Sequence, residues 1–171
     1  MDISIFFDFR FVFGDEKLVG DLRNQVTDML DGKAVFYYHL SQGIIRYKPG
    51  PSEKRIDLKK LLLPLMSFVR LYALNAGIKE TNSYSRLMQM RDMGILNPEI
   101  LNETEEALDI LCRYRLRSQF SKLEVNEVPD NILDTGTLTK IEVATLKKVK
   151  SLINELIIQV KYDYNINPQL G

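Results

Sequence analysis

The sequence predicts a mainly α-helical fold, an up-and-down helical bundle with a short β-strand at its N-terminus. Apolar residues recur at helical spacing over most of the 171 residues, in segments separated by short turns rich in Gly, Pro and Asn. One run near the start alternates instead with the period of a strand. There is no internal repeat, and amphipathic helices joined by short turns are typical of bundles.

The predicted strand covers residues 3–13, where every odd position is isoleucine or phenylalanine. A lone strand cannot satisfy its backbone groups, and no second alternating run of similar strength follows. We therefore expect its sheet to lie outside this chain, which would be the C-terminal part of a longer protein. Asp8 and Arg10 share the other face. They are either a charge pair on an edge strand or groups near an active site, where the carboxylate could assist a metal ion.

Three helices are expected in the first half of the chain. The first follows Gly14-Asp15 and ends near residue 31, and a second, aromatic-rich helix runs from 34 to about 42. Residues 48–52 form the clearest linker. The third helix begins after Asp57, a suitable N-cap, and is apolar on nearly all sides, so it should be the central buried helix. Pro64 should bend this helix or mark its first turn.

Three more helices are expected in the second half. Gly77 ends the central helix, and Thr81 or Ser83 can cap a short helix that runs to residue 93. Asn97 can cap a helix that runs to about residue 122. An irregular stretch over 126–136 leads to a last helix over 138–164, whose apolar stripe includes Ile141.

Charge and composition exclude several classes of protein. The 23 basic and 23 acidic residues give a net charge of zero, which argues against a strongly basic nucleic-acid binder. Residues 1–31 hold seven acidic and three basic residues, so the remainder is net positive by four. The single cysteine, Cys112, cannot form an internal disulfide, which fits a reducing, cytoplasmic compartment. No apolar run reaches the roughly 20 residues of a membrane span, so no membrane partner is expected.

Two polar residues occur where the helix after Asn97 should face the core. Its apolar stripe continues onto Arg115 and then Gln119, and Arg70 interrupts the central helix in the same way. A buried guanidinium is costly unless it is paired. Either these arginines pair internally with carboxylates such as Asp57, Glu106 or Asp109, or one of them faces a polar cleft and binds a phosphate or acidic group.

No residue pattern indicates catalysis by this chain alone. Phosphate-binding loops, zinc-protease motifs and serine-hydrolase motifs are absent, as is the Gly-Ser and Asp-x-Asp pair with which nucleotidyltransferases hold two metal ions. The one histidine, His39, and the one cysteine cannot form a protein-only tetrahedral zinc site. We therefore expect no catalytic residue and no metal site here, and we interpret His39 and Cys112 as structural.

An ordered set of short motifs resembles a known family. The string Phe6-Phe7-Asp8-Phe9-Arg10, with Gly14-Asp15, resembles the end of the catalytic domain in bacterial nucleotidyltransferase-like signalling proteins, and the rest of the chain resembles their C-terminal substrate-binding domain, labelled DUF294. Ser118 departs from the family, which more often has His there. The motifs that carry the resemblance are Leu18, Leu22-Arg23, Ile56-Asp57-Leu58-Lys59, Pro64, Arg70-Leu71-Tyr72-Ala73-Leu74, Thr81, Arg86-Leu87, Arg115-Leu116, Gln119 and Pro129-Asp130-Asn131.

The resemblance implies a division into two parts. Residues 1–31 would be the C-terminal edge of a nucleotidyltransferase domain, and residues 32–171 a substrate-binding bundle that forms one wall of its cleft. Asp57, Arg70, Arg86, Arg115 and Gln119 would belong to this wall or support it, and Asp8 and Arg10 would lie near the active site.

The parent protein would be similar to the uridylyltransferases that modify the PII regulator, with CBS or cyclic-nucleotide-binding sensor domains. It would use Mg2+ and a nucleoside triphosphate, with its catalytic carboxylates upstream of this chain. Its partners would be those upstream domains and a protein or small-molecule acceptor.

A second hypothesis is a non-catalytic helical module that relays a sensor signal or forms a homodimer, with structural arginines. A helix-turn-helix DNA binder is disfavoured, because no helix combines a short Gly turn with a basic exposed face.

Overall fold

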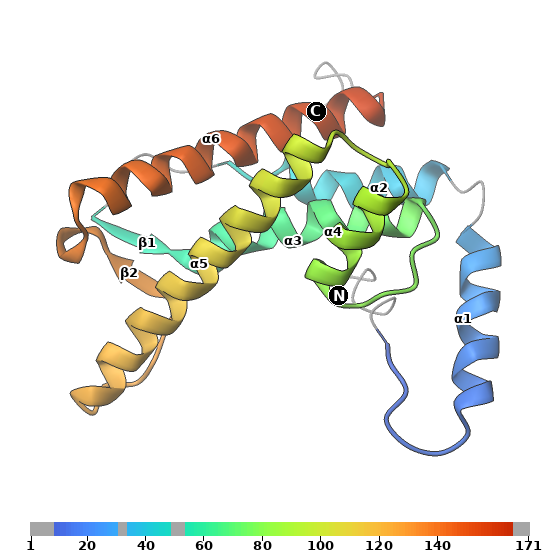
Figure 1. Ribbon diagram of the computed structural model, residues 1–171, viewed down its shortest axis with the longest axis horizontal. Helices are drawn as coiled ribbons and strands as arrows, with labels where there is room; N and C mark the ends of the chain where they lie inside the picture. Colours follow the sequence, from blue (N-terminus) through green and yellow to red (C-terminus); the bar gives the residue numbers. More distant parts are fainter. Residues whose placement is uncertain (1–8, 31–33, 49–53, 166–171) are drawn as a thin grey trace.

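The mainly α-helical fold class is confirmed by the computed structural model, which describes residues 9–30, 34–48 and 54–165 (Figure 1). Six α-helices and a small two-stranded sheet occupy these ranges. The elements are α1 (Glu16–Leu30), α2 (Ala34–Ile45), β1 (Arg55–Asp57), α3 (Leu58–Asn75), α4 (Ser83–Asp92), α5 (Pro98–Glu124), β2 (Ile132–Asp134), the 3-10 helix η2 (Thr135–Thr137) and α6 (Lys140–Asp163).

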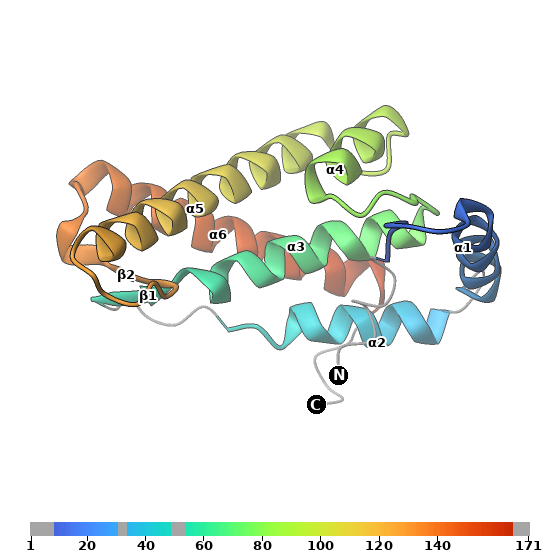
Figure 2. The same ribbon diagram turned by 90° about the horizontal axis from the view of Figure 1, so that it is seen from below.

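Four long helices form the predicted up-and-down bundle. α3 and α6 run in one direction, and α2 and α5 run in the opposite direction (Figure 2). α3 packs against α2, α4, α5 and α6, which makes it the central helix that its apolar sequence predicts. Its buried side chains include Leu65, Phe68 and Val69, none of which has measurable exposure. Pro64 lies inside α3 rather than in its first turn.

Helix starts follow the capping chemistry of the sequence. Asp57 caps α3 by accepting a hydrogen bond from Lys59 N (3.0 Å), and Asn97 caps α5 in the same way, so both predictions are confirmed. The prediction for α4 is wrong by one position. Asn82, not Thr81 or Ser83, is the cap, because its short amide side chain accepts hydrogen bonds from the free N–H groups of Tyr84 and Ser85.

The sheet lies elsewhere than the sequence predicts. β1 and β2 pair antiparallel, with Ile56 opposite Leu133, so part of the stretch expected to be irregular is a strand. Residues 1–8 of the N-terminal segment lie outside the described residues, and residues 9–13 form no strand. Within the described ranges no strand lies beside them to complete a hydrogen-bond ladder, and Phe13 is 96% exposed.

α6 begins at Lys140, two residues later than predicted, after a capping box formed by Thr139 and Glu142. Its buried stripe runs from Leu146 to Val160, whereas Ile141 is 79% exposed. The prediction that Ile141 belongs to the core stripe is therefore wrong, because the first turn of α6 extends past the core.

α1 lies beside the bundle rather than within it (Figure 1). None of its described side chains is buried, and Leu18 and Met29 are largely exposed. A hydrogen bond of 2.7 Å from Lys79 Nζ to Asn24 Oδ1 connects it to the residues after α3. In the described part of the chain, no helix has both the length and the apolar character of a membrane span.

Candidate functional site

The five predicted cleft residues divide into two groups along the bundle. Asp57 lies at the start of α3, and Arg70 lies thirteen residues further on, a rise of about 20 Å along the helix axis. Because α5 runs antiparallel to α3, its C-terminal half with Arg115 and Gln119 lies toward the Asp57 end. Arg86 lies on α4, toward the other end. A single cleft wall containing all five residues is therefore not formed.

Arg86 and Arg70 belong to the interior of the bundle to different degrees. Arg86 is 2% exposed and is one of the largest fully buried side chains, next to the buried Leu87. Arg70 is half-buried on α3. Both side chains have interaction partners. The burial of Arg86 fits the structural interpretation rather than direct contact with a substrate.

Arg115 is different, because nothing in the described part of the chain pairs with it. It continues the buried stripe of Leu108 and Leu111 on α5, and its Nε atom is buried without a hydrogen-bond partner. The predicted pairing partners are used elsewhere: Asp109 Oδ2 binds Arg113 at 2.5 Å, and Asp57 caps α3. No ion pair joins Arg115 to these carboxylates or to Glu106 in the described part of the chain, so the predicted internal pairing of Arg115 is wrong.

An unsatisfied acceptor lies on the segment that packs against the same part of α5. Ser118 Oγ donates to the carbonyl oxygen of Ile132 at 3.0 Å, which joins α5 to β2. The preceding residue, Asn131, accepts a hydrogen bond from Leu58 N at 2.9 Å through its backbone oxygen, while its side-chain Oδ1 is buried without a partner. We define the Arg115 site as Arg115, Ser118, Gln119 and Asn131.

The Arg115 site offers complementary hydrogen-bonding groups. The guanidinium is a fixed set of charged donors that matches a phosphate or carboxylate, and the amide oxygen of Asn131 can accept from a hydroxyl or amine. Buried polar groups are costly when unpaired, so a ligand that satisfied both would gain hydrogen bonds that water supplies poorly there. Gln119, half-buried one turn beyond Arg115, adds one amide donor group and one acceptor.

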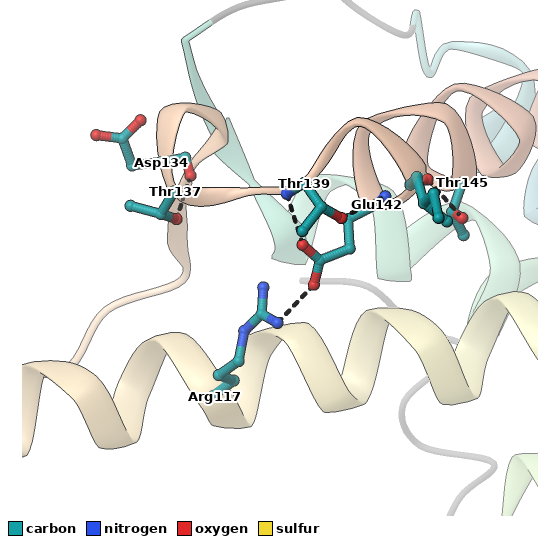
Figure 3. Close-up of polar contacts among 7 residues, drawn as sticks. Arg117, Asp134, Thr137, Thr139, Glu142 and Thr145 are labelled. Atoms are coloured by element: carbon teal, nitrogen blue, oxygen red, sulfur yellow. Dashed lines mark hydrogen bonds and ion pairs between the residues drawn. The ribbon is translucent and has the colours of Figure 1, made fainter.

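Contacts between α5 and the start of α6 hold the site's framework in place (Figure 3). Arg117 Nη1 donates to Glu142 Oε1 at 2.6 Å, and Glu142 also accepts from Thr139 N at 2.8 Å. The Thr139 backbone N–H, followed by Arg117, lowers the pKa of the Glu142 carboxyl. This carboxylate therefore connects the N-terminus of α6 to the C-terminal half of α5.

A second ion pair holds the loop that precedes Asn131. Lys122 Nζ binds Asp130 Oδ1, which also accepts from Ile132 N at 2.9 Å. The Lys122 hydrogen bond is the main cause that lowers the pKa of the Asp130 carboxyl. Through these two bonds Asp130 orients the backbone at the end of the loop. Asn131 therefore lies between α5 and the start of α3.

Two cavities lie beside α5, and the first is lined by Ser118 of the Arg115 site but not by Arg115 or Asn131. One, of about 650 Å³, lies between α5 and β2, and its lining includes Arg55, Arg117 and Lys122 as well as Glu127 and Asp134. The other, of about 460 Å³, lies between α5 and α6 and holds Glu103, Glu106 and Glu155 around Lys148. Each cavity mixes both signs of charge.

The other residues singled out in the sequence do not form a second site in the described part of the chain. Asp8 lies outside the described residues, and Arg10 is exposed on a segment without strand structure. His39 is exposed, with its ring against Tyr38, and Cys112 packs partly buried against the core. Within the described ranges, no three His, Cys, Asp or Glu side chains gather as metal ligands would.

Sequence reasoning found Arg115 and Gln119 but gave no role to Asn131 or Ser118. Asn131 follows Pro129 and Asp130 in a segment without helical periodicity, so no face could be assigned to its side chain. The available signal was Asp130. An aspartate side chain often accepts a hydrogen bond from the backbone N–H two residues later, as Asp130 does from Ile132, and this Asx-turn positions Asn131 between them.

Comparison with known proteins identifies the family of this chain. Neither the curated proteins nor the solved structures contain a match to the chain. A family model does match it over residues 38–164, most of its length, including α3 to α6 and both strands. The chain belongs to the family of this model, DUF294_C, which is described as "Putative nucleotidyltransferase substrate binding domain".

Proposed function

We propose that this chain binds and positions the substrate of a nucleotidyltransferase, with Arg115 receiving an anionic group of that substrate. The observation that carries the proposal is the half-buried Arg115, whose Nε has no partner among the described residues, together with the equally unsatisfied Oδ1 of Asn131 on the segment that Ser118 joins to α5. Membership in a substrate-binding family supports it.

The chemistry of the proposed contact follows from the placement of the guanidinium. Partial burial lowers the local dielectric and strengthens a charge-assisted hydrogen bond to a phosphate or carboxylate oxygen. Gln119 and Asn131 would bind polar groups next to that oxygen and so orient the substrate. Ser118 acts on the framework, since its hydroxyl donates to the Ile132 carbonyl.

The catalytic step itself would take place on an upstream domain of the same polypeptide. That domain would hold the nucleoside triphosphate and Mg2+, and this bundle would present the acceptor, a protein or a small molecule. A signalling role in the cytoplasm, under the control of a CBS or cyclic-nucleotide-binding domain and with uridylyltransferase-like chemistry, belongs to the same proposal.

The test is nucleotide transfer by the natural polypeptide that contains this chain. We would incubate it with each α-labelled nucleoside triphosphate, Mg2+ and a cell extract as the source of acceptor, and follow label in protein and small-molecule fractions. Arg115→Ala should raise the acceptor KM or abolish labelling. Arg113→Ala is the matched control, since Arg113 lies on the same helix but is exposed and pairs with Asp109. Equal labelling by the Arg115→Ala variant and the unmodified protein would contradict the proposal.

A second candidate is a non-catalytic interaction or dimerisation module. Leu116, Phe120 and Leu123, which are 53%, 62% and 53% exposed, form an apolar stripe at helical spacing on α5. Light scattering of the chain, with Phe120→Glu as the variant, tests this candidate. A dimer that the substitution dissociates would support it, especially if the natural polypeptide transferred no label. A monomer would contradict the dimerisation module.

A further inference from the structure

A third cavity, of about 360 Å³, lies between the end of α2 and the first turns of α3. We call it the Arg46 pocket; its lining consists of Gly43, Arg46, Tyr47, Lys48, Lys60, Leu63, Pro64 and Ser67. α2 lies on the opposite side of α3 from α4 and α5 (Figure 2). The Arg46 pocket shares no residue with the Arg115 site, so it needs its own explanation.

Among the described residues, the pocket collects positive charge that no acidic side chain in its lining compensates. Arg46, Lys48 and Lys60 are exposed, and the lining contains no acidic residue. Among the described residues, none of these three side chains forms an ion pair or a hydrogen bond. The cavity between α5 and β2 differs, because two of its three cations are paired, Arg117 with Glu142 and Lys122 with Asp130.

Three like charges around a concave surface focus a positive potential into it and attract an anion. The chain as a whole has no net charge, so general basicity does not account for the cluster. Arg46 can bind two oxygens of one phosphate with its planar fork, and the lysines act as mobile point charges for further oxygens. Arg46 and Lys48 follow the end of α2, whereas Lys60 lies in the first turn of α3, so the three cations can approach one group from two segments.

The rest of the lining is suited to an uncharged ring or chain. Leu63 and Pro64 form apolar surface, and Tyr47 contributes a half-buried aromatic ring. Burial raises the pKa of the Tyr47 phenol above its ordinary value. Ser67 adds a hydroxyl. A volume of about 360 Å³ falls at the small end of the roughly 300 to 1,000 Å³ range of ligand pockets.

We propose that the Arg46 pocket binds a phosphorylated small molecule of nucleotide size, with its phosphate groups on Arg46, Lys48 and Lys60 and its ring against Tyr47, Leu63 and Pro64. This ligand site is separate from the Arg115 site and does not depend on the proposed function.

Calorimetric titration of the full chain tests the proposal with four probes: ATP, AMP, adenosine and inorganic phosphate. ATP and AMP should bind, ATP more tightly because it carries more charge. Adenosine should bind too weakly to detect, and inorganic phosphate more weakly than AMP. Phosphate binding as tight as that of AMP would overturn the role of the apolar wall. Absence of ATP and AMP binding at millimolar concentration would overturn the whole proposal.

Charge reversal identifies the site. The double variant Arg46→Glu and Lys60→Glu should weaken ATP binding by about tenfold or more, since two phosphate contacts become repulsive. Lys140→Glu with Lys147→Glu is the matched control, because it changes net charge equally on exposed positions of α6. Circular dichroism should show that both variants are folded. An equal loss of ATP affinity in both double variants, or no loss in Arg46→Glu with Lys60→Glu, would overturn the proposal.

The Arg115→Ala variant separates this site from the proposed substrate site. It removes any ATP bound through Arg115, so the ATP binding that remains should belong to the Arg46 pocket and should be lost when Arg46→Glu and Lys60→Glu are added. If Arg115→Ala abolished ATP binding while Arg46→Glu with Lys60→Glu did not, the nucleotide would belong to the Arg115 site and the Arg46 pocket would not be the binding site.

Discussion

Arg115 and Asn131 are the residues on which the functional interpretation depends. Each buries a polar atom that has no hydrogen-bond partner in the described part of the chain. Folded proteins satisfy the great majority of such atoms, and these two lie on neighbouring segments, which is the reason for proposing a binding site there. The sequence left Arg115 open between internal pairing and a polar cleft, because a guanidinium interrupts an apolar stripe, and it could not orient Asn131, whose placement depends on the loop held by Lys122 and Asp130.

Replacement of Arg115 separates a binding role from a structural one. Because Arg115 has no ion pair to lose, Arg115→Ala should change the free energy of unfolding by less than about 1 kcal/mol. Leu111→Ala, one turn earlier on the same stripe, should cost about 2 to 5 kcal/mol, since Leu111 is fully buried. Urea denaturation of both variants provides the comparison, and a loss of several kcal/mol in Arg115→Ala would show that the residue is structural.

Acid sensitivity tests the connection between α5 and α6. The pKa values of Asp130 and Glu142 are lowered from their ordinary 3.8 and 4.5, because hydrogen bonds in the folded state favour the ionised carboxylates. The stability that they contribute should therefore be complete at pH values above these ordinary values and be lost as the pH falls through the lowered, folded-state values.

Glu142→Gln isolates one of these carboxylates, because an amide can still complete the capping box but carries no charge. The variant should have a lower Tm than the unmodified chain at neutral pH, and the two Tm curves should converge in acid. Parallel curves would show that the Glu142 charge contributes nothing to stability.

At the scale of elements, local rules predicted the helices well and the strands poorly. Caps at Asp57 and Asn97 act over two or three residues, so the sequence alone reveals them. β1 and β2 are three residues each and lie about 75 positions apart in the chain, too short and too distant for alternation to reveal their pairing. Alternation over 9–13 predicted a strand that does not form. A strand needs a hydrogen-bonded neighbour, and the described residues place none beside this segment.

α1 provides a test of how the chain divides. It has 15 residues and none of its described side chains is buried, so it contributes little to the core. A helix of this length is marginal in water without packing. Deletion of residues 1–33 should therefore change the Tm of the bundle by less than about 4 °C. Differential scanning calorimetry of the shortened chain measures this. A larger loss would show that α1 belongs to the cooperative unit and contradict the predicted boundary near residue 32.

At the scale of the whole molecule, the bundle separates its polar groups by face. α3 lies at the apolar centre of the bundle. α5 carries the Arg115 site on one side of α3, and the end of α2 contributes to the Arg46 pocket on the other side. The sequence predicted the bundle because helical periodicity is local. It could not predict that Arg86 and Arg115 would be apart, because that separation depends on how α4 and α5 cross α3.

The most direct test of the central claim is nuclear magnetic resonance of the arginine Nε–H groups, with the Arg115 signal assigned from the Arg115→Lys variant. Inorganic pyrophosphate serves as the anion probe, and Arg113 on the same helix is the internal reference. An open binding site predicts a saturable shift of the Arg115 signal at concentrations that leave Arg113 unchanged. An Arg115 signal that stays in place, or that moves only in parallel with Arg113, would contradict the assignment of the Arg115 site.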